Sequence, residues 1–497
     1  MRRVLVLFAV LLLAACGGGP DAPTLRRDVE ARLAQALPAG TLTLVELTRR
    51  GSQADTRAPA GETRRTLYFD AVLRVERDFD FGAWDAPGVA ALVSALGAGP
   101  KGISGLNSDG NQAGDLIAAH GTALYRAEGE AWVAVTTGGY RPATAPAYAT
   151  NERQGAGAIL DAMRKVVDSV PQDAAPAQRA VIEQELAAAH AAIRARLARA
   201  ANGYAIAAGG EHGQYLRFAR ALSDDEQART VPLITRGGDE NLRLLRERKV
   251  SLALAQGDAA LDAYAGTGTF FGDGPNDTLL AIGSLYPEPM HVLVRDDSGV
   301  RMLAGLKGKR VAIGLPGAAS RTTALRVLEA HGLGLSDIEA VELSIGDALI
   351  ALRQGNVDAV MQVIGLPADS IRDALVDVPL RLLPLSAPAV AKLVAANQGY
   401  FAYTIAQRSY ATQDEDVATV ATAALLLVAT DLSETEVAAV TRFVFGRGRD
   451  FAARGSAQGT QVSAATARAG LPVPLHVAAA RELDALLAGG STRGGSR

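Results

Sequence analysis

The stretch TLLAIGSLYPEPMHVLVRDDSGVRMLAGLKGKRVAIGLPGAAS, residues 278–320, decides the fold of this chain. It contains three apolar runs separated by turn-forming residues, so it predicts three short strands. Pro287 and Pro289 are expected to stop the first of them. A helix is predicted from about Thr322 to Ala330, so the third strand feeds a small-residue loop at a helix N-terminus. Free backbone N–H groups at such an end can hold an anion. The predicted strands are 279–285, 291–295 and 311–313.

Short strands and helices alternate from Tyr204 onward, which is typical of parallel α/β sheets. Residues 201–487 are numerous enough for two such lobes, and the polar tail 488–497 is expected to be disordered. Further strands are predicted at 204–207, 230–234, 250–254, 340–343 and 359–363.

The first 15 residues have the features of a bacterial signal peptide. Two arginines precede an apolar core, residues 4–13, that is too short to span a membrane. The segment ends Leu13-Ala14-Ala15-Cys16, which resembles the lipoprotein cleavage box, and residues 16–23 would form a tether. Cys16 is the only cysteine, so neither a disulfide nor a thiol catalyst is expected. An ordinary signal peptide followed by a chance cysteine is the alternative.

Two further regions are predicted between the tether and the lobes. Residues 24–150 are expected to form a small α+β domain, with a helix at 25–37, strands at 41–47 and 66–76, and a hairpin at 123–135. Residues 151–200 are expected to form a helical connector of two helices, the first near 159–170. The second helix carries an apolar stripe, which fits either packing on its own domain or a spacer and pairing surface. The stripe comprises Ile182, Leu186, Ala189, Ile193 and Leu197.

Composition and motifs argue against catalysis and nucleic-acid binding. The formal net charge is −3 and aromatic content is 5%, so the chain lacks a strong basic field and a stacking surface for bases. The six histidines form no i, i+4 pair, and the polar loop 102–114 lacks the glutamate that closes an EF-hand, so no metal site is predicted. Neither a Walker A loop nor a Gly-x-Ser-x-Gly elbow is present. We therefore expect no enzyme and no cofactor.

Several motifs follow one another in order between residues 201 and 450. Together they resemble the TAXI-type solute receptors of TRAP transporters. The motifs are Gly209-Gly210 with Gly213 and Tyr215; Gly237 with Glu240-Asn241-Leu242; Leu254-Ala255-Gln256-Gly257-Asp258; Leu285-Tyr286-Pro287-Glu288 with His291-Val292-Leu293-Val294; Leu306-Lys307-Gly308-Lys309-Arg310-Val311; and Tyr403 to Tyr410 with Asp416 to Val420.

The resemblance implies a two-lobe periplasmic-binding-protein fold of type II, with a ligand in the cleft between lobes joined by hinge strands. The second lobe would run from about Val292 to Leu385, and the C-terminal helices would complete the first. It further implies a monomeric, lipid-anchored receptor on the periplasmic face of a bacterial membrane, inner or outer. The receptor would bind a small organic anion or an acidic amino acid for TRAP-type membrane subunits.

A sensor or envelope assembly protein on the same fold is the alternative, which the extra N-terminal domain and Gly17 after the lipidated cysteine favour. The ligand-binding residues expected from the resemblance and from the neighbouring loops are Gly209, Gly210, Tyr215, Arg236, Gly237, Gly238, Asn241, Gln256, Ser320 and Arg321.

Two loops depart from the family's pattern. Its Gly-Gly-Ser loop is Arg236-Gly237-Gly238 here, and its Ser-Gly-Thr loop is Ala318-Ala319-Ser320. Two hydroxyl donors are therefore absent, while Arg236 and Arg321 have appeared. An arginine can bind a carboxylate through two parallel hydrogen bonds. Each arginine can equally be a solvated loop residue.

Removing the predicted lipid site tests the anchor. We expect Cys16→Ala to release the protein from the membrane, because no later apolar stretch approaches the ~20 residues of a spanning helix. Fractionation before and after a carbonate wash measures the release. Retention of the variant after the wash would contradict a lipid anchor at Cys16.

Overall fold

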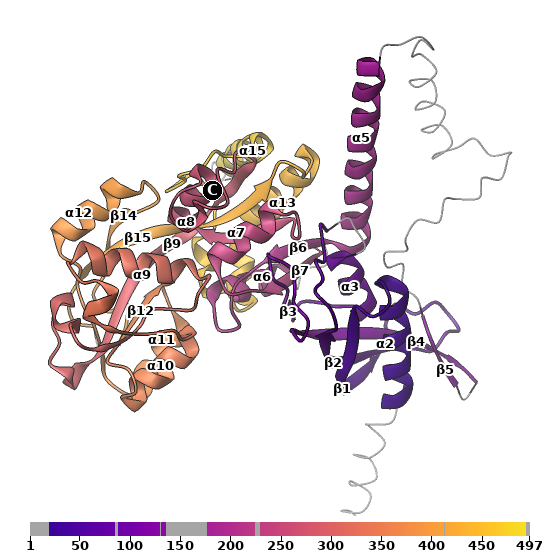
Figure 1. Cartoon of the computed structure of the whole chain (residues 1–497), viewed down its shortest axis with the longest axis horizontal. Coiled ribbons are helices and arrows are strands. Elements are labelled where there is room, and N and C mark those ends of the chain that lie inside the picture. Colours follow the sequence, from indigo (N-terminus) through magenta and orange to yellow (C-terminus); the bar gives the residue numbers. More distant parts are fainter. Residues whose placement is uncertain are drawn as a thin grey trace, which may run out of the picture.

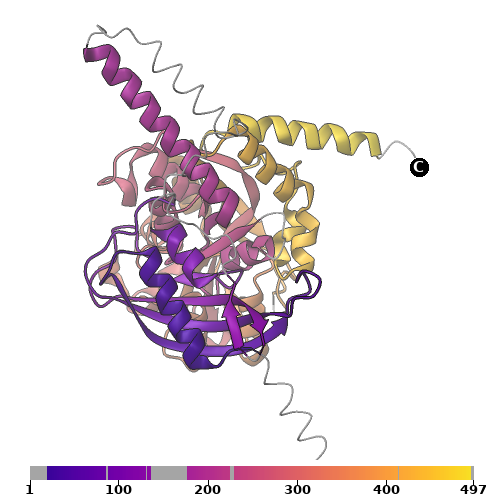
Figure 2. The same ribbon diagram turned by 90° about the vertical axis from the view of Figure 1, so that its right-hand side faces the viewer.

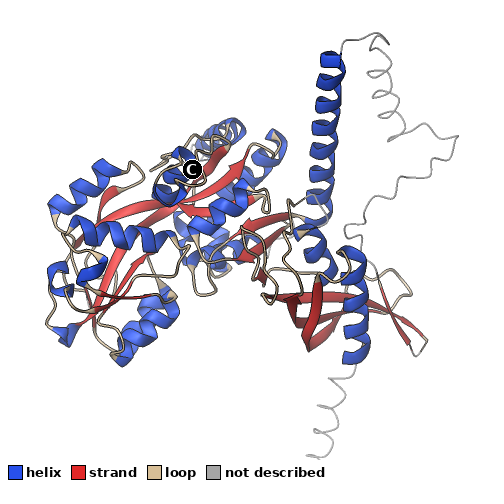
Figure 3. Ribbon diagram, viewed as in Figure 1, coloured by secondary structure: helices blue, strands red, loops and turns tan. Residues whose placement is uncertain are grey.

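The computed structural model describes residues 19–84, 88–129, 131–135, 176–223, 229–411 and 413–493. The predicted signal peptide, Cys16, the first predicted helix of the connector and residues 494–497 lie outside these residues. The prediction of a disordered tail is wrong for residues 488–493, which form the end of helix α15 (Val477–Arg493). The described chain forms an N-terminal α+β domain followed by two α/β lobes (Figure 1). Helices cover the sheets of both lobes (Figure 3).

The N-terminal domain packs two helices on an antiparallel sheet. The side chain of Asp21 caps the first helix by accepting from the Thr24 N–H, at 2.9 Å. Alternate residues of the second strand, including Leu67, Phe69 and Leu73, are buried, as a half-covered sheet requires. The elements are α2 (Ala22–Ala36), β1 (Leu42–Ala54), β2 (Arg64–Val75), α3 (Val89–Leu96), β4 (Leu116–Glu128) and β5 (Ala131–Ala134).

A short strand fuses this domain to the first lobe. β3 (Ile103–Ser104) pairs antiparallel with β4 and parallel with β7 (Thr230–Ile234), so one sheet continues from the domain into the lobe. Gly102 precedes β3 with φ +87°, and a Cβ there would lie 2.5 Å from the Pro232 carbonyl oxygen, so the junction requires glycine. The domain is therefore built onto the lobe and is not a tethered appendage.

The connector helix α5 (Pro176–Asn202) extends away from the rest of the molecule (Figures 1 and 2). Ile193 and Leu197 of its predicted apolar stripe are 44% and 64% exposed, so the described helix does not pack along its own domain. Its last turn does dock, because Arg199 is buried and pairs with Glu436 at 2.7 Å.

The first lobe has three parallel strands, β6 (Tyr204–Ala207), β7 and β8 (Leu252–Gln256), in the order β7-β6-β8. Its helices are α6 (Gln214–Ser223), α7 (Gly238–Arg246), α8 (Gly257–Ala265), α13 (Glu434–Gly446), α14 (Gly448–Ala453) and α15 (Val477–Arg493).

The second lobe is larger than predicted. Its buried cores include Tyr400, Ile405 and Tyr410, so it extends well beyond Leu385. Its strands are β10 (Arg310–Ala312), β11 (Glu339–Val341), β12 (Ala359–Val363), β13 (Leu380–Leu382) and β14 (Phe401–Ile405). Its helices are α9 (Ala319–Ala330), α10 (Ile345–Gln354), α11 (Asp369–Asp377) and α12 (Ala387–Ala396).

Two long strands, β9 (Leu279–Arg295) and β15 (Val417–Ala429), run from one lobe into the other and pair antiparallel. We call them the crossing strands. In the first lobe β8 pairs with β15, and in the second lobe β12 pairs with β9. The sheet of the first lobe thus continues from β15, and the sheet of the second lobe continues from β9.

The predicted break at Pro287 and Pro289 is wrong, because β9 continues through both residues. The Pro289 carbonyl accepts from the Ile364 N–H, so the edge of β9 that carries both proline nitrogens faces away from β15. On that edge β12 pairs only from Met290 onward. The missing N–H groups therefore interrupt no ladder, which is the setting in which a strand tolerates proline.

In the part of the chain that the structure describes, no helix combines the length and apolar character that crossing a membrane requires.

Truncating a buried side chain of a crossing strand tests how much the core around that strand stabilises the fold. Leu426 on β15 is fully buried, so we expect Leu426→Ala to lower the free energy of unfolding by about 2–5 kcal/mol. Leu335→Ala is the matched control, because Leu335 is 51% exposed and should cost far less. Urea unfolding followed by circular dichroism measures both, and equal losses would contradict the assigned burial.

Candidate functional site

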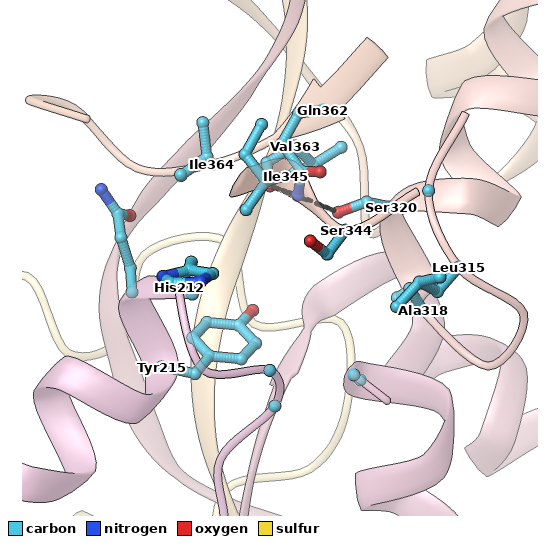
Figure 4. Close-up of a pocket in the computed structure, with 18 of the residues that line it drawn as sticks. His212, Tyr215, Leu315, Ala318, Ser320, Ser344, Ile345, Gln362, Val363 and Ile364 are labelled. Atoms are coloured by element: carbon cyan, nitrogen blue, oxygen red, sulfur yellow. Dashed lines mark hydrogen bonds between the residues drawn. The ribbon is translucent and has the colours of Figure 1, made fainter. Parts of the chain in front are cut away.

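A cavity of about 480 Å³ lies between the two lobes. Its walls come from the loops that follow β6, β7 and β8 in the first lobe and from the start of α9, the start of α10 and the end of β12 in the second. Figure 4 shows His212 and Tyr215 on one side, facing Ser320, Ile345 and Gln362 on the other. Eight of the ten predicted ligand-binding residues line it: Gly209, Gly210, Tyr215, Arg236, Gly237, Gly238, Gln256 and Ser320.

Small residues let the two lobes approach each other beside this cavity. A Cβ on Gly237 would lie 2.9 Å from the Cα of Ala318, and a Cβ on Gly238 would lie 3.0 Å from the Cβ of Ala319. The close approach leaves little room between the lobes for larger side chains in this loop. The two alanines that depart from the family's pattern therefore have a packing role here.

Ser320 connects the lobes by hydrogen bonds. Its hydroxyl oxygen accepts from the side-chain amides of Gln256 in the first lobe, at 3.1 Å, and of Gln362 in the second, at 2.9 Å. The hydroxyl donates to the Val363 carbonyl at 3.3 Å. Ser320 thus sits where both lobes meet the cavity, at the start of α9.

A carboxyl group forms the floor of the cavity. Glu288 lies on crossing strand β9, is 3% exposed, and accepts a hydrogen bond from the Tyr215 hydroxyl. Burial raises the pKa of the Glu288 carboxyl to about 8, and the nearby charge of Asp258 acts in the same direction. Burial also raises the pKa of Tyr215 well above its usual value, so its phenol keeps its proton.

The two arginines do not give the cavity an uncompensated positive charge. Arg236 lines it but forms an ion pair with Glu240. Glu240 is buried and also accepts from the N–H and hydroxyl of Ser108 in the N-terminal domain, at 2.8 and 3.2 Å. Arg321 pairs with Glu342 at 2.8 Å and is not among the lining residues.

Asn241 also lies outside the cavity lining. Its side chain is fully buried, donates to the Leu254 carbonyl at 2.7 Å and accepts from the Thr235 hydroxyl. Thr235 in turn accepts from the Gly209 N–H at 2.9 Å. Asn241 therefore fixes the loops after β6 and β7, and the structure gives it a supporting position rather than a lining one.

Several lining residues were missed by the sequence analysis. Glu288 belongs to the motif Leu285-Tyr286-Pro287-Glu288, and its charge in an otherwise apolar strand was the available signal. Ile345, Gln362 and Ile364 carried no such signal, because α10 and β12 reach the cavity only through the folding of the second lobe.

Further hydrogen bonds join the lobes around the cavity. The Gln214 side chain accepts from the Gly365 N–H and donates to the Gly365 carbonyl, at 2.8 and 2.7 Å. Asp258 of the first lobe accepts from Thr323 and Tyr400 of the second, at 2.9 and 2.6 Å. The structure is therefore in a closed arrangement. Among the described residues, no group of three or more His, Cys, Asp or Glu side chains is arranged to hold a metal ion.

The comparisons with known proteins assign a family. Residues 206–483 match the model of the NMT1-like family, which is more than half of the 497 residues, and the chain belongs to this family. A putative aliphatic sulfonates-binding protein of Escherichia coli (strain K12) is 34% identical over 109 residues. That match covers 22% of this chain and only 34% of the relative's length.

Solved structures also match part of the chain, among them two binding proteins. The periplasmic aliphatic sulphonate binding protein SsuA from Escherichia coli has a TM-score of 0.32 at 21% identity, over 57% of this chain and 82% of that one. The substrate binding protein of an amino acid ABC transporter has a TM-score of 0.30 at 12% identity, over 52% and 96% of the two chains.

A branched side chain at the lobe contact should hold the lobes apart. We expect Gly238→Val to raise the radius of gyration, because its side chain would meet Ala319 of the other lobe. The matched control is Gly272→Val, since nothing lies within 4 Å of a Cβ at Gly272. Small-angle X-ray scattering measures both variants, and equal radii would count against the closed contact.

Proposed function

We propose that this protein is an extracytoplasmic solute receptor that closes its two lobes on a small ligand and delivers it to a membrane transporter. The observation that carries the proposal is the cavity between the lobes, whose walls belong to both lobes and whose floor belongs to a crossing strand. A ligand held there contacts both lobes at once and stabilises the closed arrangement over an open one.

Two further observations support a receptor. The hydrogen bonds of Ser320, Gln214 and Asp258 join the lobes, so they would be lost when the lobes separate. The relative from Escherichia coli is named as a binding protein for aliphatic sulfonates, which are small organic anions. Both fit reversible capture of a solute better than catalysis.

The finer parts of the proposal come from the resemblance to TAXI-type receptors. They are a lipid anchor at Cys16, a monomeric protein on the periplasmic face of the membrane, and TRAP-type membrane subunits as the partner. The proposed ligand is a small organic anion or an acidic amino acid. Its acidic group would meet the backbone N–H groups of residues 210–212 and of the first turn of α9, since the nearby arginines are already paired.

A sensor or assembly protein on the same fold is the second candidate. The observation that favours it is a chain of hydrogen bonds from the N-terminal domain to a residue of the cavity lining. Ser108 of that domain holds Glu240, and Glu240 holds Arg236 of the cavity lining. A change in the N-terminal domain can therefore reach the cavity through two hydrogen-bonded steps.

Ligand binding tests the receptor proposal directly. We expect at least one organic acid, sulfonate or amino acid to raise the melting temperature of the soluble Cys16→Ala chain by several degrees, because a ligand that binds only the folded form stabilises it. Isothermal titration calorimetry should then give one site per chain. If no compound of a broad solute panel binds, a solute receptor is the wrong function.

A further inference from the structure

Two buried polar residues of the cavity lining, Glu288 and Gln256, carry oxygens that can accept hydrogen bonds. Glu288 has two carboxyl oxygens, and among the described residues one donor reaches them, the Tyr215 hydroxyl. Gln256 is 4% exposed, and its Oε1 atom is buried with no hydrogen-bond partner in the described structure. A buried acceptor without a partner costs free energy, so the Gln256 oxygen is left for a donor that is not part of the chain.

The orientation of the Gln256 amide follows from its neighbours. The Ser320 hydroxyl gives its proton to the Val363 carbonyl, so its oxygen must accept from the Gln256 Nε2 atom. The oxygen of the same amide is then the atom left for a ligand. The unpartnered atom of Gln256, a residue of the cavity lining, is therefore an acceptor and not a donor.

The sheet brings these two acceptors to one face. Gln256 is paired with Ala424 of β15, and Glu288 is paired with Thr422 of the same strand from its other side. Residues two apart on a strand point to the same face, and paired residues share it. Gln256 and Glu288 therefore emerge on the same face of the sheet, on either side of β15, and both line the cavity.

The charges of the lining agree with a ligand that brings a positive group. The acidic lining residues are Glu211, Glu288 and Asp347, and the one lining arginine, Arg236, is paired with Glu240. A ligand group that is only an anion has no donor to offer the Gln256 oxygen or the Glu288 carboxyl.

We propose that Glu288 and Gln256 form a subsite for a protonated amine, and that the ligand of this receptor carries such an amine at its inner end. An ammonium group has three donors and no acceptor, which matches a carboxylate together with one amide oxygen. A hydroxyl group has one donor and cannot satisfy both. The inference rests on the proposed receptor function and narrows its ligand to an amino compound.

The ionisation of Glu288 makes the affinity of this subsite for an amine depend on pH. The groups that face the carboxyl are Tyr215, Tyr286 and Asp258. Because the pKa of the free carboxyl is raised to about 8, Glu288 is mostly protonated at pH 6 and must lose that proton to pair with an ammonium. Affinity for an amine should therefore rise between pH 6 and pH 8, by up to about tenfold per pH unit, and then level off.

Three pairs of probes that differ only by an amino group test the subsite: glutamate and glutarate, 4-aminobutyrate and butyrate, and taurine and ethanesulfonate. Titration calorimetry on the Cys16→Ala chain should give at least about tenfold tighter binding for the amino member of the pair that fits. Glu288→Gln should remove this preference and the pH dependence. Glu329→Gln on the exposed side of α9 is the matched control and should keep both.

The possible results separate the amine subsite from the receptor function. Equal binding of an acid and its amino counterpart would overturn the amine subsite and leave the receptor function standing. A preference for the amino member that survives Glu288→Gln, in a variant with unchanged unfolding, would also overturn it. No binding of any of the six probes would overturn the amine subsite, while the broad solute panel decides the receptor function separately.

Discussion

The antiparallel ladder between β9 and β15 is the constraint on which the rest of the structure depends. Both strands pass from one lobe to the other, and each lobe extends its sheet from a different strand of the pair. Each lobe therefore builds buried core on its own side of the ladder. The same ladder holds Glu288 at the floor of the cavity, so the strands that join the lobes also contribute to the candidate site.

The two lobes come close together because the residues at their contact are small, and not because extra polar residues bridge them. Gly237 and Gly238 allow the first lobe to reach Ala318 and Ala319 of the second. Polar contacts are concentrated instead in a few buried groups at the lobe boundary, of which Ser320 and Asp258 are the clearest. The lobes thus approach closely where the loop at Gly237 meets Ala318. The carboxyl of Glu288 lies where a crossing strand forms the floor of the cavity.

Local pattern predicted much of this fold. Apolar runs located β6 and β7, and glycine spacing located the loops after them, because these features depend on neighbouring residues. The crossing strand β9 was predicted as two pieces, because the tolerance of Pro287 depends on which edge of the strand is paired. The roles of Arg236 and Asn241 also needed the structure, since Glu240 and Leu254 become their partners only after folding. Whether the eight lining residues bind a ligand stays a prediction.

A distance measured between the lobes tests the central claim, that ligand binding closes them. Phe271 in the first lobe and Val376 in the second are 82% and 84% exposed, and Cys16 is the only natural cysteine. Spin labels on cysteines at these two positions, in the Cys16→Ala chain, report the separation by double electron–electron resonance. We predict a broad distribution without ligand and a narrow one at the shorter end with ligand. The same distribution at saturating ligand and without it would contradict closure.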